Sequence, residues 1–161
     1  MTLISAALLM LALSLLAAAL FDVATFEIPD TLTVLTIAAA VLFGLGSPGF
    51  DWPSHAAAGG IFFGFGLLAF ARGWLGGGDV KLMTGCACWA TLGSLAEQVV
   101  LIALVGGGFG LALIGLRRLL AATGIAHAGS PRLIRVGEHL PYAVAIAGGM
   151  AVWAMRHLPI G

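Results

Sequence analysis

The chain has 161 residues, of which 61% are hydrophobic and 9% are charged, and its mean hydropathy is +1.11. This composition leaves too little polar surface to cover a water-soluble globule, so it indicates an integral membrane protein. The seven Lys and Arg residues balance the seven Asp and Glu residues to a formal net charge of zero, so we expect no nucleic-acid partner.

Six apolar segments predict an all-α, polytopic membrane bundle of about six transmembrane helices in a single domain, residues 1–161. Each segment lies near the about 17–25 residues that cross a hydrocarbon core. The first has no basic residue ahead of it and no clear cleavage site after it, so we expect a retained helix and not a removed signal peptide. A weak break near Gly93–Gln98 separates the fourth segment from the fifth, and without it the count would fall to five. The segments are Thr2–Phe21, Thr31–Leu45, His55–Ala71, Val80–Ala96, Gln98–Leu116 and Leu140–Met155.

Small residues inside these segments are expected to serve packing. Gly60-x-x-x-Gly64 and Gly106-x-x-x-Gly110 have the spacing that lets membrane helices approach closely. The chain has only two cysteines, Cys86 and Cys88. A zinc site or a disulfide framework needs more partners, so we expect small core residues, with a redox role as the alternative.

The basic residues predict the orientation of the bundle. In an alternating path the loops around residues 22–30, 72–79 and 117–139 lie on one side of the membrane. Basic residues gather on the cytoplasmic side of membrane proteins, so this side is expected to face the cytoplasm, with both termini outside. Only Arg156 lies on the opposite side, and the other six basic residues are Arg72, Lys81, Arg117, Arg118, Arg132 and Arg135.

Two aspartates are expected at the same cytoplasmic face, since Asp22 ends the first segment and Asp79 begins the fourth. Taken singly, Asp22 can be a helix-end residue that reaches headgroup water, and Asp79 can be the N-cap of the helix Val80–Ala96. Taken together, two carboxyl groups at hydrogen-bonding distance share one proton, as an aspartic protease requires. The ionised group takes a proton from an attacking water while its protonated partner donates to the peptide carbonyl. This chemistry needs no metal or other cofactor.

The residues around the aspartates suggest supporting roles. Gly76, Gly77 and Gly78 lack side chains and tolerate positive φ, so backbone or substrate can approach Asp79 closely; the alternative is a flexible turn. Lys81 either acts on the carboxyl group of Asp79 or anchors the helix at the cytoplasmic side.

Two further acids follow the first segment. Glu27 and Asp30 could bind a basic peptide, and the favoured role of Asp30, which follows Pro29, is to cap the second helix.

Three motifs in register resemble the type IV prepilin peptidase family, integral-membrane aspartic proteases of the Gly-x-Gly-Asp kind. The motifs are DVATFEIPD from Asp22 to Asp30, GGGDVKL from Gly76 to Leu82, and LPYAVAI from Leu140 to Ile146. In length the chain is similar to the short, peptidase-only members associated with tight-adherence (Tad/Flp) pili. Nothing in it matches the cytoplasmic loop with two Cys-x-x-Cys pairs that longer members carry.

The resemblance implies that Asp22 and Asp79 are the catalytic pair. It implies a prepilin precursor as substrate, cleaved between a short basic leader and an apolar segment at the cytoplasmic face of the bacterial inner membrane. The remaining implied partners are membrane lipid and, as an open possibility, the pilus-assembly machinery. The loop after the first aspartate is often basic in relatives, whereas here it is Val-Ala-Thr-Phe-Glu.

Other classes of protein also carry acids in a membrane bundle. A small transporter would place them near the middle of facing helices, whereas here they stand at segment ends. A non-catalytic pilus-assembly subunit would tolerate loss of either aspartate. Proteases of the presenilin or signal-peptide-peptidase type share Gly-x-Gly-Asp but place a Tyr-Asp pair in an earlier helix, and this chain has no such pair.

Overall fold

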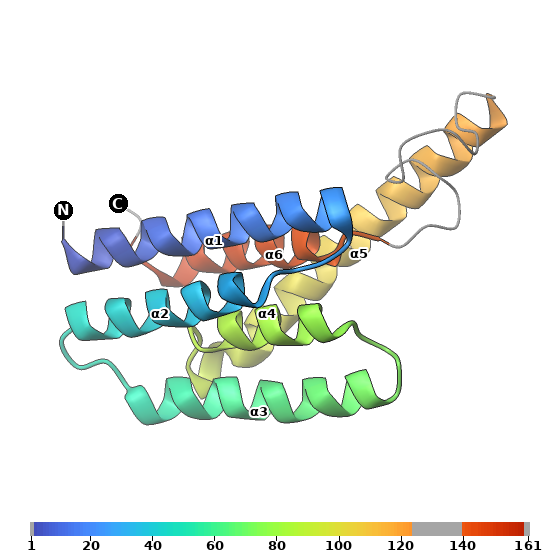
Figure 1. Ribbon diagram of the computed structural model, residues 1–161. Helices are drawn as coiled ribbons and strands as arrows, with labels where there is room; N and C mark the ends of the chain where they lie inside the picture. The colour runs from blue at the N-terminus through green and yellow to red at the C-terminus, as the bar shows by residue number, and fades with distance from the viewer. Residues whose placement is uncertain (1, 124–139, 160–161) are drawn as a thin grey trace.

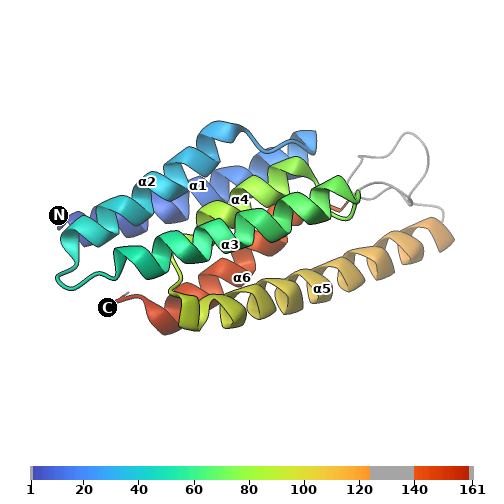
Figure 2. The same cartoon turned by 90° about the horizontal axis from the view of Figure 1, so that it is seen from below.

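The computed structural model describes residues 2–123 and 140–159, and within these residues the protein is all helical. Two long-range features are plain in Figure 1: the two termini lie together at one end of the bundle, and the later part of α5 projects beyond the other end. The view from below shows the same projection (Figure 2). The helices are α1 (Leu3–Thr25), α2 (Asp30–Gly46), α3 (Trp52–Ala71), α4 (Gly77–Ala87), α5 (Leu92–Ala122) and α6 (Tyr142–His157).

Three of the described helices, α1, α3 and α5, are long and apolar enough to cross a membrane. The helix α2 is apolar but shorter, with 17 residues. Large apolar side chains cover the outside of the molecule; Phe65 on α3 and Leu111 on α5 are 71% and 75% exposed. An apolar exterior of this extent suits lipid and not water, so the fold is a helical membrane bundle, as the composition predicts.

The predicted boundary between the fourth and fifth segments is wrong. The helix α4 ends at Ala87, and α5 begins at Leu92, so residues Gly93–Gln98 lie inside α5 instead of forming a break. With 11 residues, α4 rises only about 16 Å and does not cross a membrane alone. The turn between the two helices is buried, and Trp89 anchors it by donating its Nε1–H to the carbonyl of Thr36 at 3.1 Å.

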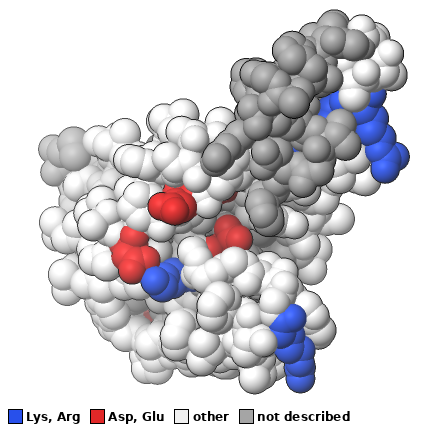
Figure 3. Space-filling view, turned by 45° about the vertical axis from the view of Figure 1, so that its right-hand side comes forward, with Lys and Arg blue, Asp and Glu red and all other residues white. Residues whose placement is uncertain are grey.

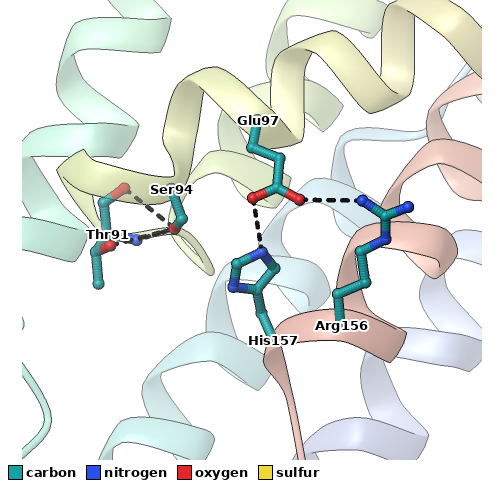
Figure 4. A network of polar contacts seen from close by, with 5 residues as sticks. All are labelled: Thr91, Ser94, Glu97, Arg156 and His157. Carbon is teal, nitrogen blue, oxygen red and sulfur yellow. Dashed lines mark hydrogen bonds and ion pairs between the residues drawn. The ribbon is translucent and has the colours of Figure 1, made fainter.

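The polar residues near Gly93–Gln98, which in the sequence indicate a break, stabilise the start of α5. Thr91 and Ser94 form a capping box there. The buried side chain of Gln98 donates to the carbonyl of Cys86, at the end of α4, at 3.0 Å. Figure 4 shows Glu97 reaching Arg156 and His157 of α6, at 3.3 and 3.0 Å. These contacts tie α5 to α4 and α6 at the end of the bundle that holds the termini.

Close packing of α5 against α6 depends on glycine. A Cβ on Gly149 would lie 2.4 Å from the Cα of Ile102, and one on Gly106 would lie 3.0 Å from the Cβ of Ala145. Gly106 therefore packs as its motif predicts. The prediction is wrong for the other motif, because a Cβ on Gly60 or Gly64 would meet nothing within 4 Å in the described structure.

The alternating path of the helices brings several helix ends and one connecting loop to the same end of the bundle. The end of α1, the start of α2, the α3–α4 loop and the starts of α4 and α6 all lie at the end opposite the termini (Figure 1). Asp22 and Asp79 therefore stand at the same end of the bundle, as the sequence predicts. Arg132 and Arg135, two of the six basic residues assigned to this side, lie outside the described residues.

Candidate active site

A cavity of about 770 Å³ opens at this end of the bundle. All eight residues that the sequence singles out for the site line it, from two stretches that are far apart along the chain. Figure 3 shows the acidic side chains gathered on this face with a basic group among them. The charged lining residues are Asp22, Glu27, Asp30, Asp79 and Lys81, and the other lining residues are Phe26, Ile28, Gly73, Trp74, Leu75, Gly76, Gly77, Gly78, Leu140 and Tyr142.

Asp22 lies in the last turn of α1, and its side chain is not simply reaching headgroup water. The residue is only 5% exposed. Its Oδ2 accepts a hydrogen bond of 2.7 Å from the backbone N–H of Ala143, in the first turn of α6. This contact joins the first helix to the last, and it holds one carboxyl oxygen of Asp22 in a fixed position.

Asp79 is the third residue of α4, and Gly76 is the N-cap, so the predicted N-cap role of Asp79 is wrong. The pKa of Asp79 is raised to about 6, first because the carboxyl group is buried and second because the negative charge of Asp22 lies near it. The hydrogen bond with the Gly76 backbone lowers this pKa and offsets part of the rise. No hydrogen bond joins the two carboxyl groups in the described structure. Asp79 is nevertheless near enough to Asp22 for the charge of Asp22 to raise its pKa. Direct sharing of a proton between the two carboxyl groups stays a prediction.

The glycines before Asp79 provide space rather than unusual backbone angles. Gly76 has φ −70° and Gly77 and Gly78 are helical, so none of these three residues uses the positive φ that glycine tolerates. A Cβ on Gly76 would lie 2.8 Å from Oδ2 of Asp79, and one on Gly78 would lie 3.3 Å from the Cβ of Ile28. The absence of a side chain at Gly76 therefore lets the carboxyl group of Asp79 fold back over the start of its own helix, and its absence at Gly78 makes room for Ile28.

Lys81 contacts Asp30 and not Asp79. Its Nζ lies 2.8 and 3.0 Å from the two carboxylate oxygens of Asp30, and both side chains are largely exposed. The N-cap of α2 is Pro29, so the prediction that Asp30 caps this helix is wrong. The ion pair instead joins the start of α2 to α4 across the cavity.

Glu27 is the acid of the cavity that has no partner among the described residues. It is exposed, and its carboxylate has no hydrogen bond or ion pair with any of them, whereas Asp30 is neutralised by Lys81. The turn that carries it is well defined, since Phe26 adopts a left-handed conformation with φ 57° and the Glu27 N–H donates to the hydroxyl of Thr25 at 3.3 Å. With four acids and one base, the charged lining attracts cations.

Several lining residues were not predicted from the sequence. Phe26, Trp74 and Tyr142 place aromatic side chains around the acids. The guanidinium of Arg72 lies 5.3 Å from the ring centre of Trp74, which is 71% exposed. The feature of the sequence that could have indicated these lining residues is the position of the aromatic residues beside helix ends. The lining therefore offers both carboxyl groups and apolar surface to a ligand.

The described residues contain no group of three or more His, Cys, Asp or Glu side chains that could hold a metal ion. The carboxyl groups of the lining can give and take protons.

Comparison with known proteins gives the family. The sequence profile of the type IV leader peptidase family matches residues 9–114, which run from within α1 to within α5. The chain belongs to this family. The match indicates a leader peptidase-like protease, and with the apolar helices it makes the protein a membrane peptidase. No curated protein matches the chain, and no solved structure matches it.

Proposed function

We propose that this leader peptidase is an aspartic endopeptidase in which Asp22 and Asp79 are the catalytic residues. The observation that carries the proposal is their convergence: two acids from α1 and α4 line one cavity, at the end of the bundle where the alternating path brings their helix ends together. The raised pKa of Asp79, at about 6, is what one member of a proton-sharing pair needs near neutral pH.

The reaction follows from the two protonation states. The ionised carboxylate takes a proton from a water molecule as the water oxygen attacks the carbonyl carbon of the scissile peptide bond. The protonated carboxyl donates its proton to the carbonyl oxygen, which gives a neutral tetrahedral diol. As the diol collapses, one carboxylate takes a hydroxyl proton and the other carboxyl protonates the departing amine nitrogen. The pair then again holds a single proton.

The substrate of the proposed reaction is a prepilin-like precursor. Its basic leader would lie at the acidic mouth of the cavity, where Glu27 has no partner in the described part of the chain, and its apolar segment would lie in the lipid beside the bundle. Gly76 leaves room for Asp79 and Gly78 leaves room for Ile28, while the ion pair of Asp30 and Lys81 joins α2 to α4 at the mouth. The positions of Arg72, Lys81, Arg117 and Arg118 along the chain support a cytoplasmic orientation of this end in a bacterial inner membrane.

The test is cleavage of a prepilin precursor by the purified peptidase in detergent or lipid. Asp22→Asn and Asp79→Asn keep the shape of each side chain and remove the acid, so each variant is expected to lose cleavage by at least about a thousandfold. The matched control is Glu97→Gln, which removes an acid at the far end of the bundle and is expected to cleave at the wild-type rate. Wild-type cleavage by either Asn variant would exclude the paired-acid mechanism.

The position of the acids does not favour a transporter. Asp22 lies in the last turn of α1 and Asp79 in the first turn of α4, whereas ion sites of transporters lie near mid-membrane.

A further inference from the structure

The start of α6 lacks a local side-chain cap, although Pro141 and Ala143 are buried there. Pro141, the N-cap residue, contributes no side-chain hydrogen bond, and the side chain of Pro141 is fully buried. The first N–H groups of a helix have no partner inside the helix, and a buried one left unpaired is costly. The N–H of Ala143 is satisfied instead by Oδ2 of Asp22, from 121 residues earlier in the chain.

The hydrogen bond between Ala143 and Asp22 also offsets an unfavourable electrostatic interaction at the end of α1. An acid in the last turn of a helix faces the partial negative charge of that helix's free carbonyls. Asp22 is such an acid, and α1 has no basic residue in its last turn. The partial positive charge at the start of α6 offsets this unfavourable term. Asp22 thus takes the place of an N-cap for α6, and α6 stabilises Asp22.

We propose that Pro141 is a positioning residue: by withholding a local cap from α6, it leaves the Ala143 N–H to Asp22 and so orients the carboxyl group for catalysis. Oδ2 is held by this bond, and Oδ1 accepts from no residue in the described structure, so Oδ1 is the oxygen available to water and substrate in the cavity. The catalytic part of this inference rests on the proposed function, whereas the capping part does not.

The first test compares Pro141→Ser with Pro141→Ala. Both variants remove the proline ring, but only serine can accept a hydrogen bond from the N–H of Ala143 or Val144 and so compete with Asp22. Pro141→Ser is expected to melt at the same temperature as Pro141→Ala or higher, and to have a kcat about tenfold lower, with KM unchanged and an altered pH profile of kcat. A purely structural role of residue 141 predicts that stability and kcat change together. Equal kcat values and pH profiles for the two variants would overturn the proposal.

The second test needs no activity and uses Asp22 itself. Asp22→Asn keeps an oxygen that can accept from Ala143, whereas Asp22→Ala leaves the buried N–H unpaired. The Asn variant is therefore expected to melt near the wild-type temperature and the Ala variant at a clearly lower one. Equal melting temperatures for all three proteins would show that Asp22 does not cap α6. Failure of the wild type to cleave a precursor would instead count against the proposed function and leave this comparison valid.

Discussion

Replacement of Gly76 by alanine is expected to disable the site while leaving the fold intact. The new Cβ would lie 2.8 Å from Oδ2 of Asp79, and ordinary van der Waals contact begins at 3.4 Å. The carboxyl group must therefore move by about 0.6 Å, because it is the movable end of a side chain and the helix start is not. A displacement of about 1 Å in an active site can cost about a hundredfold in rate, so we expect kcat to fall about tenfold to hundredfold.

The effect of this change on folding is expected to be small. Gly76 has φ −70° and ψ 148°, which alanine adopts freely. Alanine is a poorer N-cap than glycine, and the free energy of unfolding should fall by no more than about 1 kcal/mol. Thermal unfolding in detergent, measured alongside cleavage, separates the two effects.

Gly77→Ala is the matched control for Gly76→Ala. It adds the same methyl group to the next residue, where the nearest atom is a ring carbon of Phe70 at 3.4 Å, an ordinary contact. We expect this variant to keep near wild-type kcat. If Gly76→Ala also keeps wild-type kcat, or if both variants lose it equally, then close approach of Asp79 to Gly76 is not what the reaction requires.

Three further outcomes are expected. Because the pKa of Asp79 is raised to about 6, the singly protonated pair is lost as pH rises through that value, so kcat should fall at higher pH toward about tenfold per unit; a flat profile between about pH 5 and 8 would contradict this. Glu27→Gln should raise KM about twofold to fivefold for a substrate with a basic leader, as loss of an exposed ion pair predicts, and should have no effect on a substrate whose leader is neutral. Gly149→Ala should lower the free energy of unfolding by about 1–3 kcal/mol, because its Cβ would meet the backbone of Ile102 at 2.4 Å, whereas Gly60→Ala, in open space, should not destabilise; thermal denaturation compares the two.

The helices could be predicted from the sequence except where polar residues can either mark a break between helices or lie inside a helix with partners on another helix. The hydropathy of α1, α2 and α3 places these helices within a few residues of their observed bounds. The sequence predicts a weak break near Gly93–Gln98, and this stretch contains Glu97 and Gln98, whose charged and amide groups are costly in lipid unless they have partners. In the structure each has a partner on another helix, Arg156 and His157 for Glu97 and the Cys86 carbonyl for Gln98. Hydropathy records the cost of a polar group but not the partner that offsets it.

The residues that line the cavity could be predicted in part from the sequence, whereas most of their contacts could not. Counting helices was enough to place Asp22 and Asp79 at one end, because each crossing reverses the chain. The pairing of Lys81 was left open by the sequence, since this lysine lies two residues from Asp79 but 51 residues from Asp30, which it contacts. Spacing along the sequence favours a partner that is near in the chain. The packing of α2 against α4 instead brings Asp30 to Lys81.

The hydrogen bond between Asp22 and Ala143 shows why a site of this kind is hard to derive from one sequence and why it is sensitive to change. A backbone N–H carries no mark in the sequence, and the N–H of Ala143 is available because the N-cap residue, Pro141, provides no side-chain cap. The buried start of α6 then stabilises an acid at the end of α1, where α1 itself disfavours one. Because one bond serves both needs, a substitution that improves the local cap of α6 works against Asp22. Stability and catalysis are therefore expected to respond in opposite directions at residue 141, which no rule based on burial or hydropathy would predict.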